Sequence, residues 1–174
     1  MAQTTSQFPV SRPISRATRA AWLDGSSSLL DECQRQVFRG SGPGGQKRNK
    51  TSSGVRLIHT PSGCTSIATE RRSQKQNLTQ ALARLRLEIA TEIRCEPADI
   101  QFLAVGASHP MFPACVADLF DFMLRASWSV RDCANACGTS TGQITRLICA
   151  DPRVLAKVNQ RRQSMGMRGL RDRI

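Results

Sequence analysis

The chain has 174 residues, enough for one ordinary domain or two small ones, which excludes a large multidomain machine. Hydrophobic residues make up 40% of the sequence, and together with the 12 glycines this share is typical of globular proteins rather than disordered ones. The 25 Lys and Arg against 13 Asp and Glu leave a net charge of +12, which indicates a polyanionic partner, most often nucleic acid.

Neither the apolar runs nor the N-terminal residues indicate a membrane or secreted protein. The longest apolar runs, 102–105 and 147–150, are far shorter than a bilayer-spanning helix, so we expect no membrane partner. Residues 1–20 lack the apolar stretch of a secretory signal, although their arginines leave a transit peptide open. The seven cysteines are dispersed and odd in number, which favours reduced thiols and a cytoplasmic location.

An arm, a short helix and a strand are predicted at the start of the chain. Residues 1–25 combine Ser, Thr, Pro and Arg with few large apolar side chains, which predicts a flexible basic N-terminal arm. Ser26–Ser28 offer N-caps for a short helix, and residues 34–39 have the composition of a strand. That strand leads into Gly40–Gly45, a Gly-Ser-Gly-Pro-Gly-Gly sequence that neither a helix nor a strand would tolerate.

A hairpin and a long helix are predicted after this loop. Residues 55–60 show the alternation of a strand, the Pro-Ser-Gly of 61–63 supplies a turn, and 64–69 form a second weak strand. Ser73 is a candidate N-cap for a helix whose apolar residues recur at helical spacing: Leu78, Leu82, Leu85 and Ile89. Residues 100–105 are either a last strand or an apolar connector. These elements predict a small α+β domain over residues 26–105.

The remainder of the sequence predicts a small all-α, helix-turn-helix-like domain over residues 106–152. Gly106–Pro110 is the best candidate boundary, because it separates the first region from a new helical periodicity. Within residues 130–149, four residues occupy the characteristic positions of a helix-turn-helix: Ala134, Gly138, Ile144 and Leu147. Residues 153–174 hold seven Lys or Arg and one acid, which predicts a basic C-terminal helix or tail.

The second helix of the predicted helix-turn-helix carries outward side chains that could read bases or hold phosphates, Thr141, Gln143, Thr145 and Arg146. Whether this module binds RNA, DNA or a protein stays open. Cys133 and Cys137 lie one helical turn apart, which raises the question of zinc. Both fall on core positions of the motif, where a free Cys behaves as a small hydrophobe, so no metal is expected.

The glycine loop matches two nucleotide-binding patterns only in part. Residues 40–45 satisfy G-x-G-x-x-G, but a dinucleotide site needs an apolar helix next, and residues 46–54 are polar. In the P-loop pattern, Gln46 stands where the phosphate-binding Lys belongs, and no Ser or Thr follows it. We therefore expect no nucleotide cofactor. A solvated surface loop is the remaining simple interpretation of the glycines and lysines.

The order of the residues in and after this loop is more specific. Phe38-Arg-Gly-Ser-Gly-Pro-Gly-Gly-Gln46 is followed by Asn49-Lys50-Thr51, Val55-Arg-Leu57, His59, Pro61-Ser-Gly63 and Arg72-Ser-Gln74-x-x-Asn77. Over about residues 30–95 this sequence resembles the catalytic domain of class I peptide chain release factors. One departure is that the family usually carries an apolar residue, often Val, where this chain has Arg48.

The resemblance implies an activity and a set of catalytic residues. In that family the Gly-Gly-Gln loop enters the peptidyl transferase centre of the large ribosomal subunit and promotes hydrolysis of the peptidyl-tRNA ester. Gly44, Gly45 and Gln46 occupy the matching positions, and the resemblance makes Gln46 a candidate for N-methylation. A backbone N–H at Gln46 could stabilise the developing oxyanion or leaving oxygen, and its side-chain amide could orient water, without any cofactor.

The expected partners are the ribosome, its large-subunit rRNA and the P-site peptidyl-tRNA. The residues expected to contact RNA near the loop are Arg39, Ser41, Lys47, Arg48, Asn49, Lys50, Arg56, Arg71 and Arg72. In the C-terminal region the expected RNA contacts are Gln143, Arg146, Arg161 and Arg162.

The expected function is ribosome-dependent hydrolysis of peptidyl-tRNA. A chain of 174 residues has no room for the additional domains that read stop codons, and it resembles stop-codon-independent rescue factors that use a basic C-terminal tail. We therefore expect codon-independent rescue of stalled ribosomes, with a companion decoding protein left open. The alternative is a non-catalytic nucleic-acid-binding or regulatory protein that acts through its helix-turn-helix.

Overall fold

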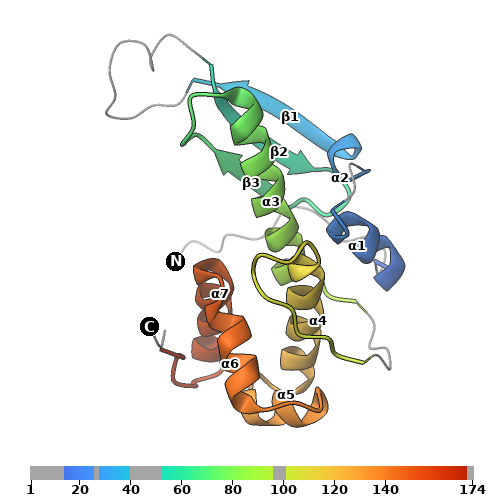
Figure 1. Ribbon diagram of the computed structural model, residues 1–174, viewed down its shortest axis with the longest axis vertical. Coiled ribbons are helices and arrows are strands. Elements are labelled where there is room, and N and C mark those ends of the chain that lie inside the picture. The colour runs from blue at the N-terminus through green and yellow to red at the C-terminus, as the bar shows by residue number, and fades with distance from the viewer. Residues whose placement is uncertain (1–13, 26–27, 40–51, 96–100, 172–174) are drawn as a thin grey trace, which may run out of the picture.

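The computed structural model describes residues 14–25, 28–39, 52–95 and 101–171. Its first half contains a three-stranded antiparallel sheet in the order β1 (Cys33–Phe38), β2 (Gly54–His59) and β3 (Thr65–Ala68). The long helix α3 (Gln74–Glu92) lies along one face of this sheet (Figure 1). The predicted α+β class is confirmed.

The hairpin and α3 each bury one face, because their buried residues recur with the period of a strand in the hairpin and of a helix in α3. In β2 the alternating residues Val55, Leu57 and His59 are buried, and in β3 Ser66 and Ala68 are buried beside them. Helix α3 covers this face with Ala81, Leu85 and Ile89, none of which is exposed to solvent. The Ser73 hydroxyl caps α3 by accepting a hydrogen bond from the Gln76 backbone N–H, as predicted.

Residues 16–23 form helix α1 (Arg16–Leu23), so the prediction of a flexible arm through residue 25 is wrong for this segment. The Ser15 hydroxyl caps the helix, and Trp22 and Leu23 are 3% and 1% exposed in the core. Their burial offsets the entropy cost of ordering the segment. Residues 1–13 of the predicted arm lie outside the described residues. The short helix α2 (Ser28–Asp31) follows and buries Leu29.

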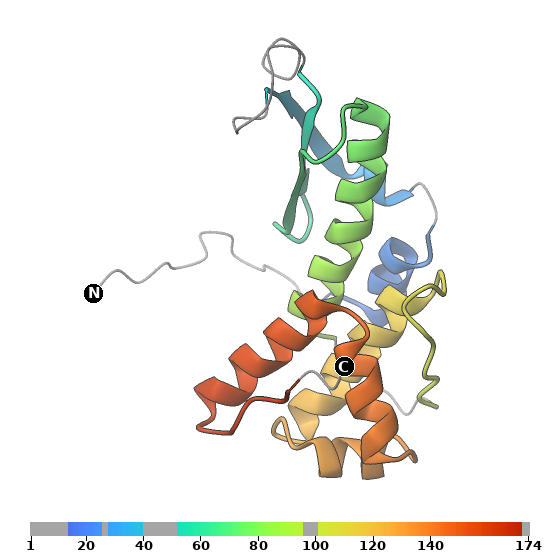
Figure 2. The same ribbon diagram turned by 60° about the vertical axis from the view of Figure 1, so that its left-hand side comes forward.

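The second half of the chain is helical. It contains α4 (Phe112–Arg125), α5 (Val130–Ala136), α6 (Thr141–Cys149) and α7 (Pro152–Ser164), while residues 101–105 form neither a helix nor a strand. Helix α4 continues from the lower end of α3, and α6 and α7 lie beside it (Figures 1 and 2). Gly138, with φ +64°, turns the chain between α5 and α6, and Ser140 caps α6.

The predicted boundary at Gly106–Pro110 separates two regions with different sequence periodicity, but the two regions share one hydrophobic core. Leu85 and Ile89 of α3, Val116 of α4 and Val154 of α7 belong to one cluster of buried apolar side chains. The helices therefore help to bury the lower part of α3. Removal of residues 110–174 would expose this surface to water, so the first region is not expected to keep its stability alone.

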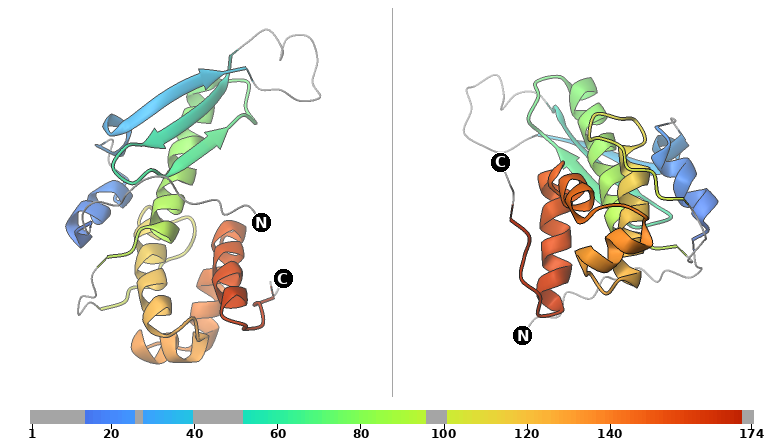
Figure 3. Two further views of the ribbon diagram at one scale, coloured as in Figure 1. Left: turned by 180° about the vertical axis from the view of Figure 1, so that it is seen from behind. Right: turned by 60° about the horizontal axis from the view of Figure 1, so that its bottom comes forward.

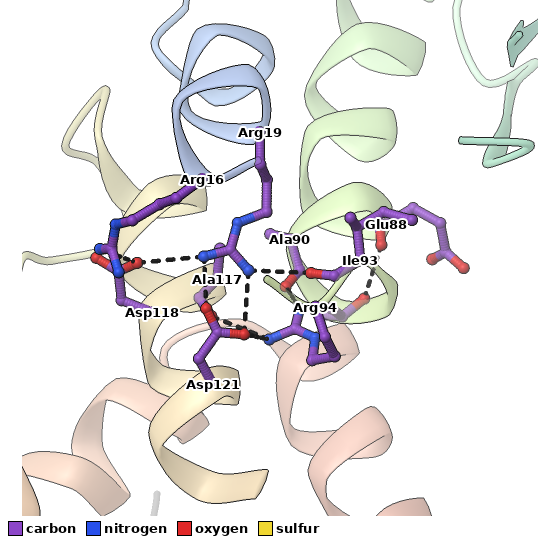
Figure 4. A network of polar contacts seen from close by, with 10 residues as sticks. Arg16, Arg19, Glu88, Ala90, Ile93, Arg94, Ala117, Asp118 and Asp121 are labelled. Atoms are coloured by element: carbon purple, nitrogen blue, oxygen red, sulfur yellow. Dashed lines mark hydrogen bonds and ion pairs between the residues drawn. The ribbon is translucent and has the colours of Figure 1, made fainter. Parts of the chain in front are cut away.

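A buried ion-pair network also joins the two halves (Figure 4). Arg19 of α1 is 2% exposed and donates to Asp121 of α4, with an Nη2 to Oδ2 distance of 2.6 Å. Arg94, just after α3, donates to Oδ1 of the same carboxylate at 2.8 Å, while Arg16 pairs with Asp118 at 2.6 Å. Burial lowers the pKa of Arg94 to about 10, so it is still charged at neutral pH.

A buried histidine predicts a pH dependence of stability. His59 is fully buried; its ring packs edge-on against Trp22, its Nδ1 lies 2.7 Å from the Ser62 hydroxyl, and its Nε2 lies 3.5 Å from Glu32. Burial lowers the pKa of His59 below 6.5, although Glu32 opposes the shift. The unfolded chain therefore takes up a proton more readily than the folded protein as the pH falls below about 6.5.

The free energy of unfolding is therefore expected to decrease on acidification, and a His59→Gln variant should lose this part of the decrease. Urea denaturation of both proteins at about pH 7.5 and about pH 5.5 measures the difference. If the pH change lowers the stability of the two proteins equally, the titration of His59 does not contribute.

Candidate functional site

The candidate site lies at the end of the sheet from which the glycine loop leaves. Strand β1 ends at Phe38 and β2 begins at Gly54, and these two residues are paired in the register. This end, where β1 finishes and β2 starts, is the upper end of the sheet in Figure 1. The structure does not describe residues 40–51, and the predicted site residues in this segment lie outside the described residues: Ser41, Gly44, Gly45, Gln46, Lys47, Arg48, Asn49 and Lys50.

A buried asparagine holds the base of the loop. Asn77, in the first turn of α3, is fully buried and donates from Nδ2 to the Ser53 carbonyl at 2.7 Å and the Arg71 carbonyl at 2.9 Å. Its Oδ1 accepts from the Arg71 backbone N–H at 2.9 Å. One side chain thus ties together the residue before β2, the turn before α3 and α3 itself. Each such bond contributes about 1 kcal/mol to stability.

Close packing fixes the paired strand ends. A Cβ atom on Gly54 would lie 3.0 Å from the Phe38 ring and from the Phe38 carbonyl oxygen, so only glycine fits without a backbone shift. The Arg56 guanidinium lies over the same ring, 5.9 Å from its centroid. The end of the hairpin is therefore held by side-chain packing as well as by the strand register.

Four predicted RNA-contacting residues come together around this end of the sheet. Arg39, Arg56, Arg71 and Arg72 are all exposed, and none of them pairs with a carboxylate among the residues that the structure describes. The neighbouring acid, Glu70, is instead paired with Arg84 at 2.9 Å. Unpaired, exposed guanidinium groups of this kind suit phosphate oxygens, because they can donate two parallel hydrogen bonds.

The predicted contacts in the C-terminal region lie elsewhere. Gln143 and Arg146 are exposed on α6, and this helix lies in the lower part of the molecule in Figure 1, whereas the sheet lies in the upper part. Arg161 of α7 pairs with Glu92 at 3.1 Å, and Arg162 donates to the carbonyls of Trp128 and Arg168. Arg161 and Arg162 thus take part in holding α7 and the following segment in place, whatever else they contact.

Asn77 was missed as a site residue by the sequence analysis. The sequence did contain an indication of its importance, because Asn77 belongs to the Arg-Ser-Gln-x-x-Asn run that carries the family resemblance. A polar residue of that type in the first turn of an amphipathic helix could be a surface residue or a buried one. Only its burial and its bonds to Ser53 and Arg71 identify its place beneath the loop.

The described helices contain none that is long and apolar enough to cross a membrane. In the described ranges, no group of three or more His, Cys, Asp or Glu side chains could hold a metal ion. The Sγ atoms of Cys133 and Cys137 lie 4.0 Å apart on one side of α5, with Cys133 fully buried in the helical core.

Comparison with known proteins identifies the region around the site. A family model described as RF-1 domain matches residues 29–101. Peptide chain release factor 1 of Syntrophobacter fumaroxidans is 45% identical over 60 residues, 34% of this chain and 17% of that protein. Mitochondrial peptide chain release factor 1 of Kluyveromyces lactis is 47% identical over 66 residues, 38% of this chain and 17% of that protein.

Peptide chain release factor 1 of Kineococcus radiotolerans is 43% identical over 73 residues, which is 42% of this chain and 20% of that protein. The chain therefore spans at most about a fifth of the length of these relatives. No solved structure matches the chain.

Proposed function

We propose that this protein hydrolyses the ester bond of peptidyl-tRNA on the ribosome, because residues 29–101 match the RF-1 domain model and are similar to peptide chain release factors. The observation that carries the proposal is the Gly44-Gly45-Gln46 sequence, which lies inside the matched segment and between two strands whose ends are tied together. The partners are the large-subunit rRNA and the P-site peptidyl-tRNA.

The reaction breaks one bond and forms another. A water oxygen attacks the ester carbonyl carbon, the bond to the tRNA 3′-oxygen breaks, and the protons of the water end on the 3′-oxygen and the new carboxyl group. In this proposal the backbone N–H of Gln46 stabilises the developing negative charge, and its side-chain amide orients the water. Gly44 and Gly45 allow the backbone to approach the ester closely. No cofactor is required.

Binding to RNA is assigned to the arginines at the loop end of the sheet. Arg39, Arg56, Arg71 and Arg72 are exposed and unpaired in the described part of the chain, which supports contact with rRNA and with the acceptor end of the tRNA. Asn77 is proposed as a positioning residue, since it holds the base of the loop through Ser53.

We propose that release does not depend on a stop codon and serves the rescue of stalled ribosomes. The helices after residue 111 lie outside the segment that matches the release factor family. Their exposed polar and basic residues, Gln143 and Arg146 on α6 among them, support a role as an anchor on ribosomal RNA. A regulatory role without catalysis has no specific observation in its favour.

The test is a peptide-release assay with the full chain and ribosomes that hold labelled peptidyl-tRNA in the P-site. Complexes with a stop codon, a sense codon and no codon in the A-site are compared. Equal release from all three is expected. Release from the stop-codon complex alone would contradict codon independence, and absence of release from every complex would contradict the hydrolase proposal.

Salt dependence tests two of the four arginines at the loop end of the sheet, Arg71 and Arg72. Each phosphate contact adds a slope of about −0.7 to the plot of log affinity against log salt concentration for single strands. We expect the Arg71→Gln/Arg72→Gln variant to bind ribosomes more weakly and to lose a slope of about 1 to 2. Ribosome pelleting at several salt concentrations measures both quantities. Arg35→Gln/Arg131→Gln, which removes two exposed charges elsewhere, is the matched control, and an equal effect in the control would contradict specific contacts.

A further inference from the structure

The basic residues of the C-terminal region fall into two structural groups. In α7, Arg153 pairs with Asp151, Lys157 pairs with Glu88 and Glu92, and Arg161 pairs with Glu92. These charges are used within the fold. By contrast, Arg146, Arg168 and Arg171 form no ion pair within the described ranges.

These three unpaired arginines line one groove. After α7 the chain reverses at Gly166, with φ +72°, and runs back beside the helix (Figure 3). This C-terminal segment, residues 167–171, and α6 form the two walls of a groove of about 1000 Å³. Thr141, Gly142 and Thr145 of α6 line it together with the arginines, and none of its lining residues is acidic.

Two side chains of α7 hold the C-terminal wall: Arg162 donates from Nε to the Arg168 carbonyl at 3.1 Å, and Asn159 binds Leu170. The Leu170 backbone N–H donates to Oδ1 of Asn159 at 2.6 Å, and Nδ2 of Asn159 donates to the Leu170 carbonyl at 2.9 Å. A side-chain amide that satisfies both backbone groups of one residue fixes the local position of the chain. Arg168 and Arg171 lie on either side of Leu170 in the chain. The bonds from Asn159 therefore fix the backbone that carries these two arginines next to α6.

We propose that this groove binds the phosphodiester backbone of single-stranded RNA. Three unpaired guanidinium groups, the Thr141 hydroxyl and no acid match a chain of phosphates; the Thr145 hydroxyl donates to the Thr141 carbonyl within α6. The choice of RNA over DNA rests on the proposed function. No aromatic side chain lines the groove, so bases have no stacking platform and binding is insensitive to base sequence.

A duplex does not suit this site. To enter a major groove about 12 Å wide, a recognition helix must stand clear of its surroundings. Here the C-terminal segment lies against α6, with the Cys149 Sγ 3.9 Å from the Arg171 carbonyl oxygen. The outward face of α6 is thus the wall of a groove, which admits an extended strand.

The experiment measures the fluorescence anisotropy of a labelled RNA of about 12 nucleotides with the purified full chain. The triple variant Arg146→Gln/Arg168→Gln/Arg171→Gln is expected to bind at least about tenfold more weakly and to lose a salt slope of about 2. The control removes three exposed charges elsewhere, Arg35→Gln/Arg125→Gln/Arg131→Gln, and should change affinity less than about threefold. Equal losses in the two variants would overturn the proposal.

Two further variants test whether RNA binding depends on the groove itself or only on the overall positive charge of the protein. Gly142→Asp has no close neighbour for its Cβ and adds a carboxylate near the N-terminus of α6, where an acid favours the helix. It should retain thermal stability and lose RNA binding. Asn159→Ala changes no charge but removes both bonds to Leu170, which loosens the C-terminal wall, and should also weaken binding. Wild-type affinity in both variants would overturn the site.

The same assay with matched RNA, DNA and duplex probes identifies the ligand. Tighter binding to the duplex, or a clear preference for DNA over RNA, would contradict the proposal. The measurement needs no ribosome, so failure of peptide release would leave its outcome unaffected, and loss of RNA binding would leave the hydrolase proposal to its own test.

Discussion

Replacement of Gly45 by alanine is expected to reduce peptide release about 100-fold or more while ribosome binding stays nearly unchanged. The methyl group restricts the backbone and obstructs close approach to the ester, so the Gln46 N–H no longer reaches the developing charge. Loss of one donor of this kind typically costs about 100-fold to 1000-fold in rate. Single-turnover release with saturating protein measures the effect on the chemical step.

Gln46→Ala tests the side chain separately. Because alanine keeps the backbone N–H at position 46, this variant should impair release less than Gly45→Ala. Gly106→Ala is the matched control: its Cβ would meet no atom within 4 Å, and release should be unchanged. Wild-type release by Gly45→Ala would refute the catalytic assignment of the triplet.

Asp121→Ala is expected to destabilise the whole protein by about 3–5 kcal/mol. The carboxylate is 12% exposed and neutralises both Arg19, which is 2% exposed, and Arg94. Its removal leaves the buried Arg19 and the half-buried Arg94, which is 23% exposed, without their shared partner (Figure 4). Chemical denaturation followed by far-ultraviolet circular dichroism gives the free energy of unfolding.

Asp118→Ala is the matched comparison in the same helix. Its main partner Arg16 is 31% exposed and Asp118 is 24% exposed, so water can replace much of this interaction. A loss of about 1 kcal/mol is expected. If both variants lost the same stability, the buried part of the network would not be what joins α1 and α3 to α4.

Sequence periodicity was enough to predict the central elements of the fold. Strand alternation in residues 55–60 and helical spacing from Leu78 to Ile89 are confirmed by β2 and α3, because each pattern records which face its own element buries. The Gly44-Gly45-Gln46 triplet was also found from sequence alone, since the order of its neighbours carries the family resemblance.

Other features depended on residues far apart in the chain. Helix α1 has only two large apolar side chains that are buried, Trp22 and Leu23, and its Arg19 is buried because Asp121 lies opposite, 102 positions later. No local pattern contains that pairing. The segment therefore resembled a basic arm, and only the tertiary structure showed a helix docked on the core.

The same reason explains the C-terminal charges. In the sequence, Arg161 and Arg168 belong to one basic run and are indistinguishable. In the structure, Arg161 meets Glu92, 69 positions earlier, while Arg168 faces a groove that contains no acid. Sequence by itself determined how many charges the region carries and which helices hold them. Tertiary structure decided which are neutralised, because a partner's distance through space is independent of its distance along the chain.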